Sequence, residues 1–210
     1  MTDYNSIIEY IYKITNIEIN EENKHKLIKY ASLAIDYNKK VNITGAKNEE
    51  SFFNDHIADS LYALNIFYDY DNIIDIGTGA GLPSIPLAVI YSNKKFTLCE
   101  SKNKKVDFLK IAKKELDLNN IEIKCINAYE IKEKYDTITS RAFSDISTLL
   151  KIFSKIKTKN ARLIAYKGKM EKIEEELKNA NISKNKYNIE IKKLNSIMDK
   201  ERHIVIIYSN

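Results

Sequence analysis

Three of the chain's five glycines and both of its prolines stand in one stretch, DNIIDIGTGAGLPSIPLAV, residues 71–89. An apolar run ends at Asp75 and Gly77, and Gly79 and Gly81 follow at every second position. Glycine lets a backbone turn tightly and approach a ligand closely. The prolines stand where a helix would start, and proline is tolerated in a helix's first turn. The stretch therefore predicts a strand, a ligand-holding loop and a helix whose N-terminus faces the ligand.

The glycine spacing narrows the class of ligand. A P-loop needs a Lys-Ser/Thr pair after its last glycine, and none is present. The dinucleotide fingerprint would place its third glycine at position 82, where Leu82 stands, so a nicotinamide oxidoreductase is the least favoured class. The spacing Asp-x-Gly-x-Gly-x-Gly suits a ligand without a pyrophosphate. S-adenosylmethionine (SAM) is the leading candidate.

An acidic residue at the end of the next β-rich run agrees with this interpretation. KFTLCE ends at Glu100, 19 residues after Gly81. A carboxylate at the tip of a second strand is placed to accept hydrogen bonds from ribose hydroxyls. The alternative is a carboxylate that only caps the start of the following helix. Loop and acid together predict a class I SAM-dependent methyltransferase.

Two further strand ends complete a predicted pocket, because ligands of open α/β sheets bind beyond the carboxyl ends of the strands. Tyr129 and Glu130 follow the third β-rich run and are expected near the adenine. Arg141 follows the fourth run and is expected to point into the site. The alternative for Arg141 is an ion pair with a surface carboxylate.

The elements that must position these residues alternate between β-rich and helical patterns. The β-rich runs are NIIDIG, KFTLCE, IEIKCIN, YDTITSRA, ARLIAYKG, YNIEIKKL and RHIVIIYS. Helices are expected at 84–92, 102–118, 145–156 and 170–180. Alternation of this kind predicts parallel βαβ units, whereas the short linker before the last run predicts an antiparallel final pair.

The predicted fold is therefore α/β, a Rossmann-like, mostly parallel seven-stranded sheet with an antiparallel last strand. Residues 1–70 read as a helical extension, with Phe53, Ile57, Leu61 and Leu64 at helical spacing on one stripe. We expect this extension to cover the site and residues 71–210 to form the SAM-binding domain.

Composition sets the remaining limits. A net charge of +5 suits a polyanionic partner such as nucleic acid, although abundant Lys, Ile, Asn and Tyr also fit AT-rich codons. No apolar run approaches the length of a membrane span, and the N-terminus does not resemble a signal peptide. Cys99 and Cys125 are interpreted as buried, reduced thiols of a cytoplasmic protein, and their spacing predicts no metal site.

The residues after the fourth β-rich run restrict the chemistry of transfer. TSRAF contains no proline, unlike the Asn/Asp-Pro-Pro-aromatic motif of enzymes that methylate exocyclic base amines. No cysteine nucleophile stands at a strand end in the site, which argues against C5-pyrimidine chemistry. An atom with a lone pair and no proton to lose, such as guanine N7, needs no general base. Catalysis would then rest on positioning and electrostatics.

Several separated motifs resemble the glucose-inhibited division protein B family (RsmG), bacterial small-subunit rRNA guanine-N7 methyltransferases. They are VNITGAKNEESFFNDHIADSL, IIDIGTGAGLPSIPLAV, CESKNKKVDFL, ITSRAFSDIS, AYKGK and ERHIVIIY. The resemblance covers about residues 22–209. It implies SAM-dependent methylation of a guanine in the 530 loop of 16S rRNA, so the implied partner is that rRNA or the small ribosomal subunit.

The resemblance also implies roles for particular residues. SAM contacts fall on Gly77, Leu82, Tyr129, Glu130 and Arg141, and Tyr129 departs from the smaller residue more usual at its place. Asn42, Thr44, His56, Asp59 and Ser60 are implied to be more than the turn and helix residues that their local patterns suggest. The candidate catalytic residues are Arg141, His56 and Asn42. The candidate cofactor-binding residues are Gly77, Gly79, Gly81, Leu82, Glu100, Tyr129, Glu130 and Arg141. The candidate RNA-binding residues are Thr44, Lys167, Arg202 and His203.

Two other functions remain open at this point. A methyltransferase of the same fold could act on a small molecule or a protein, because fold does not fix substrate. A non-enzymatic module could bind RNA and use SAM only structurally. A basic rim around the pocket would favour RNA, and an enclosed pocket would favour a small substrate. Nothing in the sequence indicates an obligate oligomer, so a monomer is expected.

Overall fold

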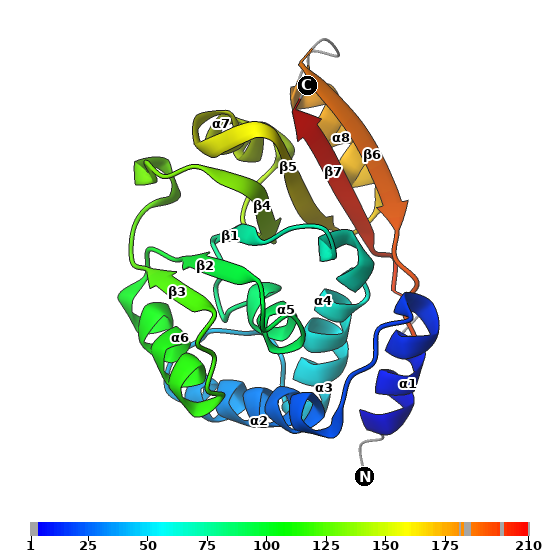
Figure 1. Ribbon diagram of the computed structural model, residues 1–210, viewed down its shortest axis with the longest axis vertical. Coiled ribbons are helices and arrows are strands. Elements are labelled where there is room, and N and C mark those ends of the chain that lie inside the picture. The colour runs from blue at the N-terminus through cyan, green and yellow to red at the C-terminus, as the bar shows by residue number, and fades with distance from the viewer. Residues whose placement is uncertain (1–3, 181, 183–185, 198–199, 210) are drawn as a thin grey trace.

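A single mixed sheet forms the centre of the molecule (Figure 1). The computed structural model describes residues 4–180, 182, 186–197 and 200–209. Within them the strands are β1 (Asn72–Ile76), β2 (Lys95–Cys99), β3 (Ile121–Lys124), β4 (Tyr135–Arg141), β5 (Lys157–Lys167), β6 (Tyr187–Lys193) and β7 (His203–Ser209). Their order is β3-β2-β1-β4-β5-β7-β6. Strands β1 to β5 pair in parallel, and β7 pairs antiparallel with both β5 and β6. The predicted fold class is confirmed.

Helices surround the sheet. They are α1 (Tyr4–Thr15), α2 (Glu21–Asn38), α3 (Glu49–Phe52), the π-helical η1 (Phe53–Ala58), α4 (Asp59–Leu61), η2 (Leu64–Phe67), α5 (Ser84–Ile90), α6 (Asn103–Glu115), η3 (Ala128–Glu130), α7 (Ile146–Ile156) and α8 (Met170–Ala180). The four helices expected after residue 72 are present, with ends within three residues of the predicted ones. The apolar stripe that starts at Phe53 is buried as expected, but a π-helical turn interrupts it.

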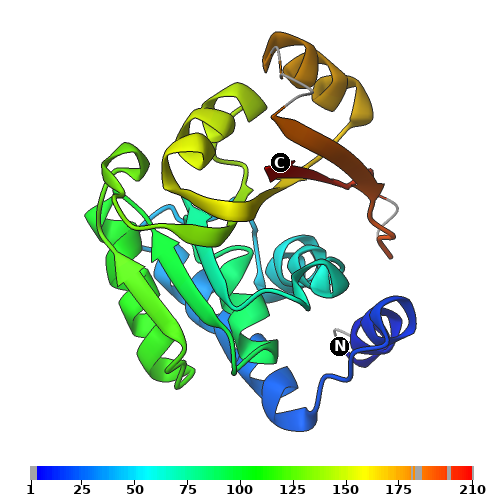
Figure 2. The same ribbon diagram turned by 45° about the horizontal axis from the view of Figure 1, so that its top comes forward.

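The sheet separates two hydrophobic layers because successive strand residues face opposite sides. Ile73 packs with α1 to α6 in one core, whereas Ile74 packs with α7 and α8 in the other. Figures 1 and 2 show α7 and α8 across the sheet from α2, α5 and α6. β1 therefore has apolar layers on both faces, which explains its continuous apolar sequence.

Helix α2 ties the N-terminal helices to the glycine loop. Asn20 caps its start by accepting from the Asn23 backbone N–H, and Leu27 and Tyr30 are fully buried on its inner face. The Tyr30 hydroxyl donates to the Ala80 carbonyl at 2.5 Å. The helices before residue 70 thus share one core with the sheet and fix the loop after β1 from outside.

The two cysteines differ in burial. Cys99 ends β2 inside the sheet and is 1% exposed, and burial raises its pKa to about 12. Cys125 is exposed, so the prediction that both thiols are buried was wrong for this residue. The reason is that β3 is an edge strand that already ends at Lys124.

Membrane-spanning helices and metal clusters are both absent from the described part of the chain. No helix there is long and apolar enough to cross a membrane. No group of three or more His, Cys, Asp or Glu side chains there is arranged to hold a metal ion.

Candidate active site

Two adjoining hollows lie beyond the carboxyl ends of the central strands. β1 pairs with β2 on one side and β4 on the other, so strand order reverses there, where α/β folds bind ligands. The smaller hollow, of about 360 Å³, is lined from the ends of β1 to β4 by Gly77, Glu100, Tyr129 and Phe143 among others. The larger, of about 690 Å³, lies between the ends of β4, β5 and β7. Both are lined by Ala142 and Phe143.

Glu100 fastens the glycine loop to the end of β2. Its Oε2 accepts from the Gly79 backbone N–H at 3.1 Å, and its Oε1 accepts from the N–H groups of Ser101 and Lys102, each at 2.9 Å. It lines the smaller hollow while only 6% exposed. A carboxylate has about four acceptor positions, so Glu100 can also accept from a ribose hydroxyl. The interpretation of Glu100 as a carboxylate at the start of the next helix describes the contacts with Ser101 and Lys102, and the ribose contact stays a prediction.

The three loop glycines all have positive φ angles, but they differ in what an added Cβ would contact. A methyl group on Gly77 (φ +67°) would lie 2.1 Å from Cδ2 of Phe143. A Cβ on Gly79 (φ +60°) would make ordinary contacts, 3.7 Å from Lys105 Nζ and 3.9 Å from the Gly77 carbonyl oxygen. At Gly81 (φ +93°) a Cβ would lie 2.3 Å from Cδ1 of Ile85. Gly81 therefore serves close packing, and its contact with the cofactor stays a prediction.

Asp75 is a fully buried carboxylate directly beneath the loop. Burial raises its pKa to about 7, against the opposing hydrogen bond from the Thr78 hydroxyl, which donates to Oδ2 at 2.6 Å. Its other oxygen, Oδ1, has no hydrogen-bond partner. The side chain and backbone of Ser84 at the start of α5 also oppose this rise in the pKa, and Asp75, which is 0% exposed, lines neither hollow.

Arg141 binds the π-helical turn. Its Nη2 donates to the Asp55 carbonyl at 2.8 Å and its Nη1 donates to the His56 carbonyl at 2.9 Å. Further contacts reach the Ser60 hydroxyl at 3.4 Å and Asp59 Oδ2 at 3.5 Å. The side chain borders the larger hollow, but its terminal N–H groups are engaged within the chain. Arg141 therefore reaches the border of the larger hollow as expected, and its contact with SAM stays a prediction.

His56 is held neutral by its surroundings. Burial, together with the adjacent Arg141 charge, lowers its pKa to about 4. Its Nδ1 lies 3.0 Å from Arg141 Nη2 and accepts from it, because a guanidinium can only donate. The proton of the neutral ring is then on Nε2. Neither hollow is lined by His56.

The segment before β7 binds the same turn through ion pairs. Asp59 is 3% exposed and accepts from Arg202 Nε at 2.7 Å as well as from Arg141. Lys200 pairs with Asp55. Charges from three parts of the chain thus meet at residues 55–59, and Arg202, whose side chain is 30% exposed, keeps part of its guanidinium toward the larger hollow.

The remaining predicted RNA contacts are also engaged internally. Lys167 donates to the Ser144 carbonyl at 2.9 Å and to Glu176 Oε2 at 2.6 Å. His203 is 4% exposed, with its Nδ1 2.7 Å from the Gly168 carbonyl. Both line the larger hollow, and their contact with an RNA phosphate stays a prediction.

Of the other predicted residues, one lines a hollow and the rest do not. Tyr129 is 50% exposed and lines the smaller hollow. Glu130 is exposed beside it without lining it, and Leu82 packs against the core. The Thr44 hydroxyl accepts from the Ala46 N–H within a turn, and Asn42 is exposed nearby. The structure therefore does not bring Asn42, Thr44 or His56 into either hollow.

Sequence reasoning missed several residues that the structure places at the site. Lys105 and Lys102 line the smaller hollow and Lys172 lines the larger one. Phe143 stands in a motif that the sequence singled out, but it was given no role. Its position directly after the sheet's fourth strand was a usable signal.

The chain matches a protein family over most of its length. A family model described as rRNA small subunit methyltransferase G matches residues 23–205. A protein named Ribosomal RNA small subunit methyltransferase G from Brachyspira hyodysenteriae is 76% identical over 205 residues, which cover 98% of this chain and 99% of that one. The chain belongs to this family. Membership confirms the family that the sequence motifs indicated.

More distant similarities agree with this family assignment. The protein of the same name from Borreliella burgdorferi is 33% identical over 208 residues, covering 97% of this chain and 99% of that one. A SAM-dependent methyltransferase from Aquifex aeolicus matches the fold with a TM-score of 0.59 at 16% identity, covering 76% of this chain and 93% of that one. The latter likeness concerns the fold alone.

SAM, the cofactor expected for a methyltransferase family of this fold, fits the residues present. The smaller hollow is lined by the buried carboxylate of Glu100 at the end of β2, by Gly77 of the glycine loop and by the aromatic side chain of Tyr129. A carboxylate suits the ribose hydroxyls of SAM, and an aromatic ring suits its adenine.

Proposed function

We propose that this protein transfers a methyl group from SAM to N7 of a guanine in the 530 loop of 16S ribosomal RNA. The observation that carries the proposal is the 76% identity, over nearly the whole chain, to a protein named as a methyltransferase of small-subunit ribosomal RNA. The atom and the loop rest on the motif resemblance and on the chemistry of the residues after β4. We further propose that the protein acts as a cytoplasmic monomer.

The smaller hollow is the proposed cofactor site. Glu100 holds the ribose through its remaining acceptor positions, and the backbone of Ala128 and the ring of Tyr129 border the adenine. When bound, SAM supplies an electrophilic methyl group. Gly77 keeps the loop close to β2 through its N–H, which donates to the Cys99 carbonyl at 2.9 Å.

The larger hollow is the proposed site of the target base. Guanine N7 carries a lone pair and no proton, so the chain need not supply a general base at the reacting atom. His56 fits this requirement as a neutral group that is bonded to Arg141 and outside the hollow. Arg141 and Asp59 line this hollow and act as positioning residues that hold the π-helical turn behind it. Alignment of the two reactants then provides the rate enhancement.

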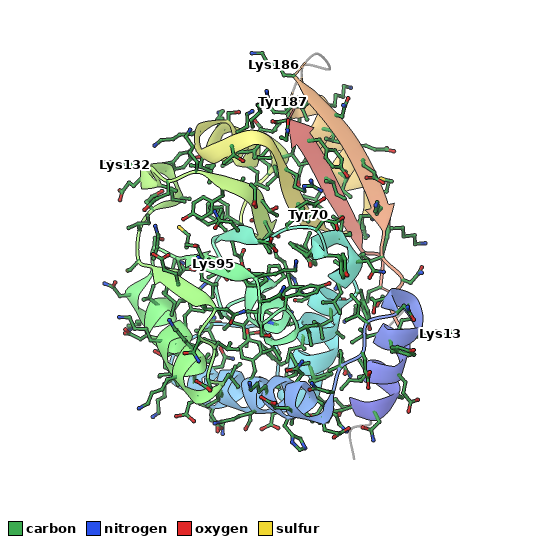
Figure 3. All side chains as sticks on the ribbon, in the orientation of Figure 1. Lys13, Tyr70, Lys95, Lys132, Lys186 and Tyr187 are labelled. Carbon is green, nitrogen blue, oxygen red and sulfur yellow. The ribbon has the colours of Figure 1, made fainter. Side chains whose placement is uncertain are left out.

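Cations at the rims of both hollows are the proposed contacts for RNA phosphates. Lys102 and Lys105 lie at the smaller hollow, and Lys172 and the exposed part of Arg202 lie at the larger one. Figure 3 shows Lys13, Lys132 and Lys186 at the edge of the molecule, so lysine charge also extends around its periphery. Phosphate contacts of this kind fix register without reading sequence.

The chemistry is tested with two small-subunit RNA transcripts, one containing guanosine and one containing 7-deazaguanosine. We expect labelled methyl transfer to the guanosine transcript only, with 7-methylguanosine as the labelled nucleoside. Equal transfer to both transcripts would overturn N7 as the acceptor. SAM binding without transfer to either transcript, or to small subunits lacking the modification, would favour the alternative substrate class, a small molecule or a protein.

A further inference from the structure

Phe143 is an exposed aromatic ring on the boundary between the two hollows. It lies directly beyond β4 and 40% of its surface is exposed, although phenylalanine is normally buried. Among the described residues, it and Ala142 are shared by the linings of both hollows. An apolar ring held at this boundary borders on both the proposed methyl donor and the proposed base site.

The backbone just before this ring is in a strained conformation. Ala142 has a φ of +54°, a left-handed conformation that costs a non-glycine residue free energy. Such strain is concentrated at functional sites. The turn lets Arg141 bond inward to the π-helical turn while Phe143 lies over Gly77 on the other side. A side chain at Gly77 would collide with the ring, because its Cβ would lie 2.1 Å from Phe143 Cδ2.

We propose, building on the proposed function, that the target guanine stacks on Phe143 in the larger hollow. Aromatic rings are the groups on which proteins stack bases taken out of their helical context. Because the smaller hollow borders on the same ring, an edge atom of the stacked base lies next to the proposed methyl donor. Stacking tolerates any base, so Phe143 positions the guanine and other groups select it.

Two substitutions at position 143 distinguish stacking on the target base from a contact with the cofactor. Phe143→Leu keeps an apolar side chain without an aromatic face, and Phe143→Tyr keeps the face. We expect Phe143→Leu to lower kcat/KM for small-subunit RNA about 5- to 150-fold, in line with the loss of one base–aromatic stack. The Kd for SAM and the Tm should stay close to wild type. Phe143→Tyr should retain kcat/KM within about threefold.

The same series can overturn the proposal. A Phe143→Leu variant whose Kd for SAM weakens by the same factor as kcat/KM falls would identify the ring as a cofactor contact. A Tm that falls with kcat/KM in both variants would identify a packing role. Tyr12→Leu is the matched control, because Tyr12 is a 51% exposed aromatic residue on α1 outside both hollows.

Fluorescence provides a readout that does not require turnover. The chain contains no tryptophan, so Phe143→Trp places a single indole at the boundary, and Tyr12→Trp places one on α1. With S-adenosylhomocysteine present, unmodified small-subunit RNA should quench the indole at position 143 and leave that at position 12 nearly unchanged. Equal quenching of the two, or quenching of neither, would overturn the stacking proposal.

Wild-type protein distinguishes failure of the stacking proposal from failure of the proposed function. If wild type methylates the RNA and Phe143→Leu does so equally well, only the stacking proposal fails. If wild type methylates no RNA, the proposed function fails and the stacking proposal fails with it. Quenching specific to position 143 together with wild-type methylation supports both.

Discussion

At the scale of single residues, the site depends on polar groups that are bonded to one another. Arg141 has its terminal nitrogens on the carbonyls of Asp55 and His56. Burial, and then the charge of the same arginine, lowers the pKa of His56 and keeps it neutral. Asp59 offsets this buried charge and also accepts from Arg202. Removing one member of such a cluster leaves a buried partner unsatisfied, which costs more than the pair gained.

The neutral state of His56 predicts a pH-dependent stability. Its pKa of about 4 in the folded protein lies below its ordinary value of 6.5, so the unfolded chain takes up a proton first as pH falls. The His56 contribution to the free energy of unfolding is therefore intact above pH 6.5 and is lost between about pH 6.5 and 4. In that window we expect the free energy of unfolding of wild type to fall, relative to that of His56→Gln, by about 1.4 kcal/mol for each pH unit.

Urea unfolding at several pH values measures this difference. His25→Gln is the control, because His25 is exposed on α2 and should give the wild-type pH dependence. Parallel curves for wild type and His56→Gln between pH 6.5 and 4 would contradict a buried, neutral His56.

Arg141→Lys tests whether the arginine positions the turn or contacts a ligand. Lysine keeps the charge but cannot make the forked contacts to residues 55, 56 and 60. We expect the free energy of unfolding to fall by about 2 kcal/mol or more, in the range of lost hydrogen bonds to a charged group. The free energy of SAM binding should change by less than the free energy of unfolding does. Undiminished stability with strongly weakened SAM binding, measured by calorimetry, would indicate a direct ligand contact instead.

At the scale of elements, the loop between β1 and α5 and the π-helical turn build the site together. The loop approaches β2 through Glu100, and the turn exposes carbonyls to Arg141 at the end of β4. π-helical turns often mark functional sites. The helix α2 then covers the loop, with the Tyr30 hydroxyl on the Ala80 carbonyl.

The second and third glycines of this loop are expected to respond differently to alanine. Gly81→Ala meets Ile85 and Leu109 at a φ of +93°, so we expect a loss of about 2–4 kcal/mol from strain and overpacking. Gly79→Ala meets only the end of Lys105 at a φ of +60° and should cost about 1 kcal/mol. Chemical denaturation of both variants compares them directly, and an equal loss would contradict the packing role of Gly81.

The element boundaries were predictable where the sequence pattern is local. Short apolar runs between helical segments predicted β1 to β7, because each strand needs only its own residues and a turn to be recognised. The π-helical turn at 53–58 was missed, because the apolar stripe through Phe53 and Ile57 keeps ordinary helical spacing. The inward bonding of Arg141 and Lys167 was missed because their partners are distant in the chain.

At the scale of the whole molecule, strand order brings the site together. The reversal at β1 places the ends of β1, β2 and β4 side by side, and the antiparallel β7 brings Arg202 and His203 to the end of β5. One hollow suits the cofactor and the adjoining one suits the base, with Phe143 between them. Lys102 and Lys105 at the smaller hollow suit a polyanionic substrate, whereas the larger hollow has Lys172 and Arg202 beside the carboxylates of Asp145, Glu175 and Glu176.

The central claim is methyl transfer to one guanine of small-subunit RNA. The most direct measurement uses purified protein, labelled SAM and small ribosomal subunits or their RNA from a strain lacking the modification. The RNA is then digested into fragments and the labelled nucleoside is identified in each. The account predicts 7-methylguanosine confined to the fragment that contains the 530 loop. Label in another nucleoside, in another fragment or in no RNA at all would contradict it.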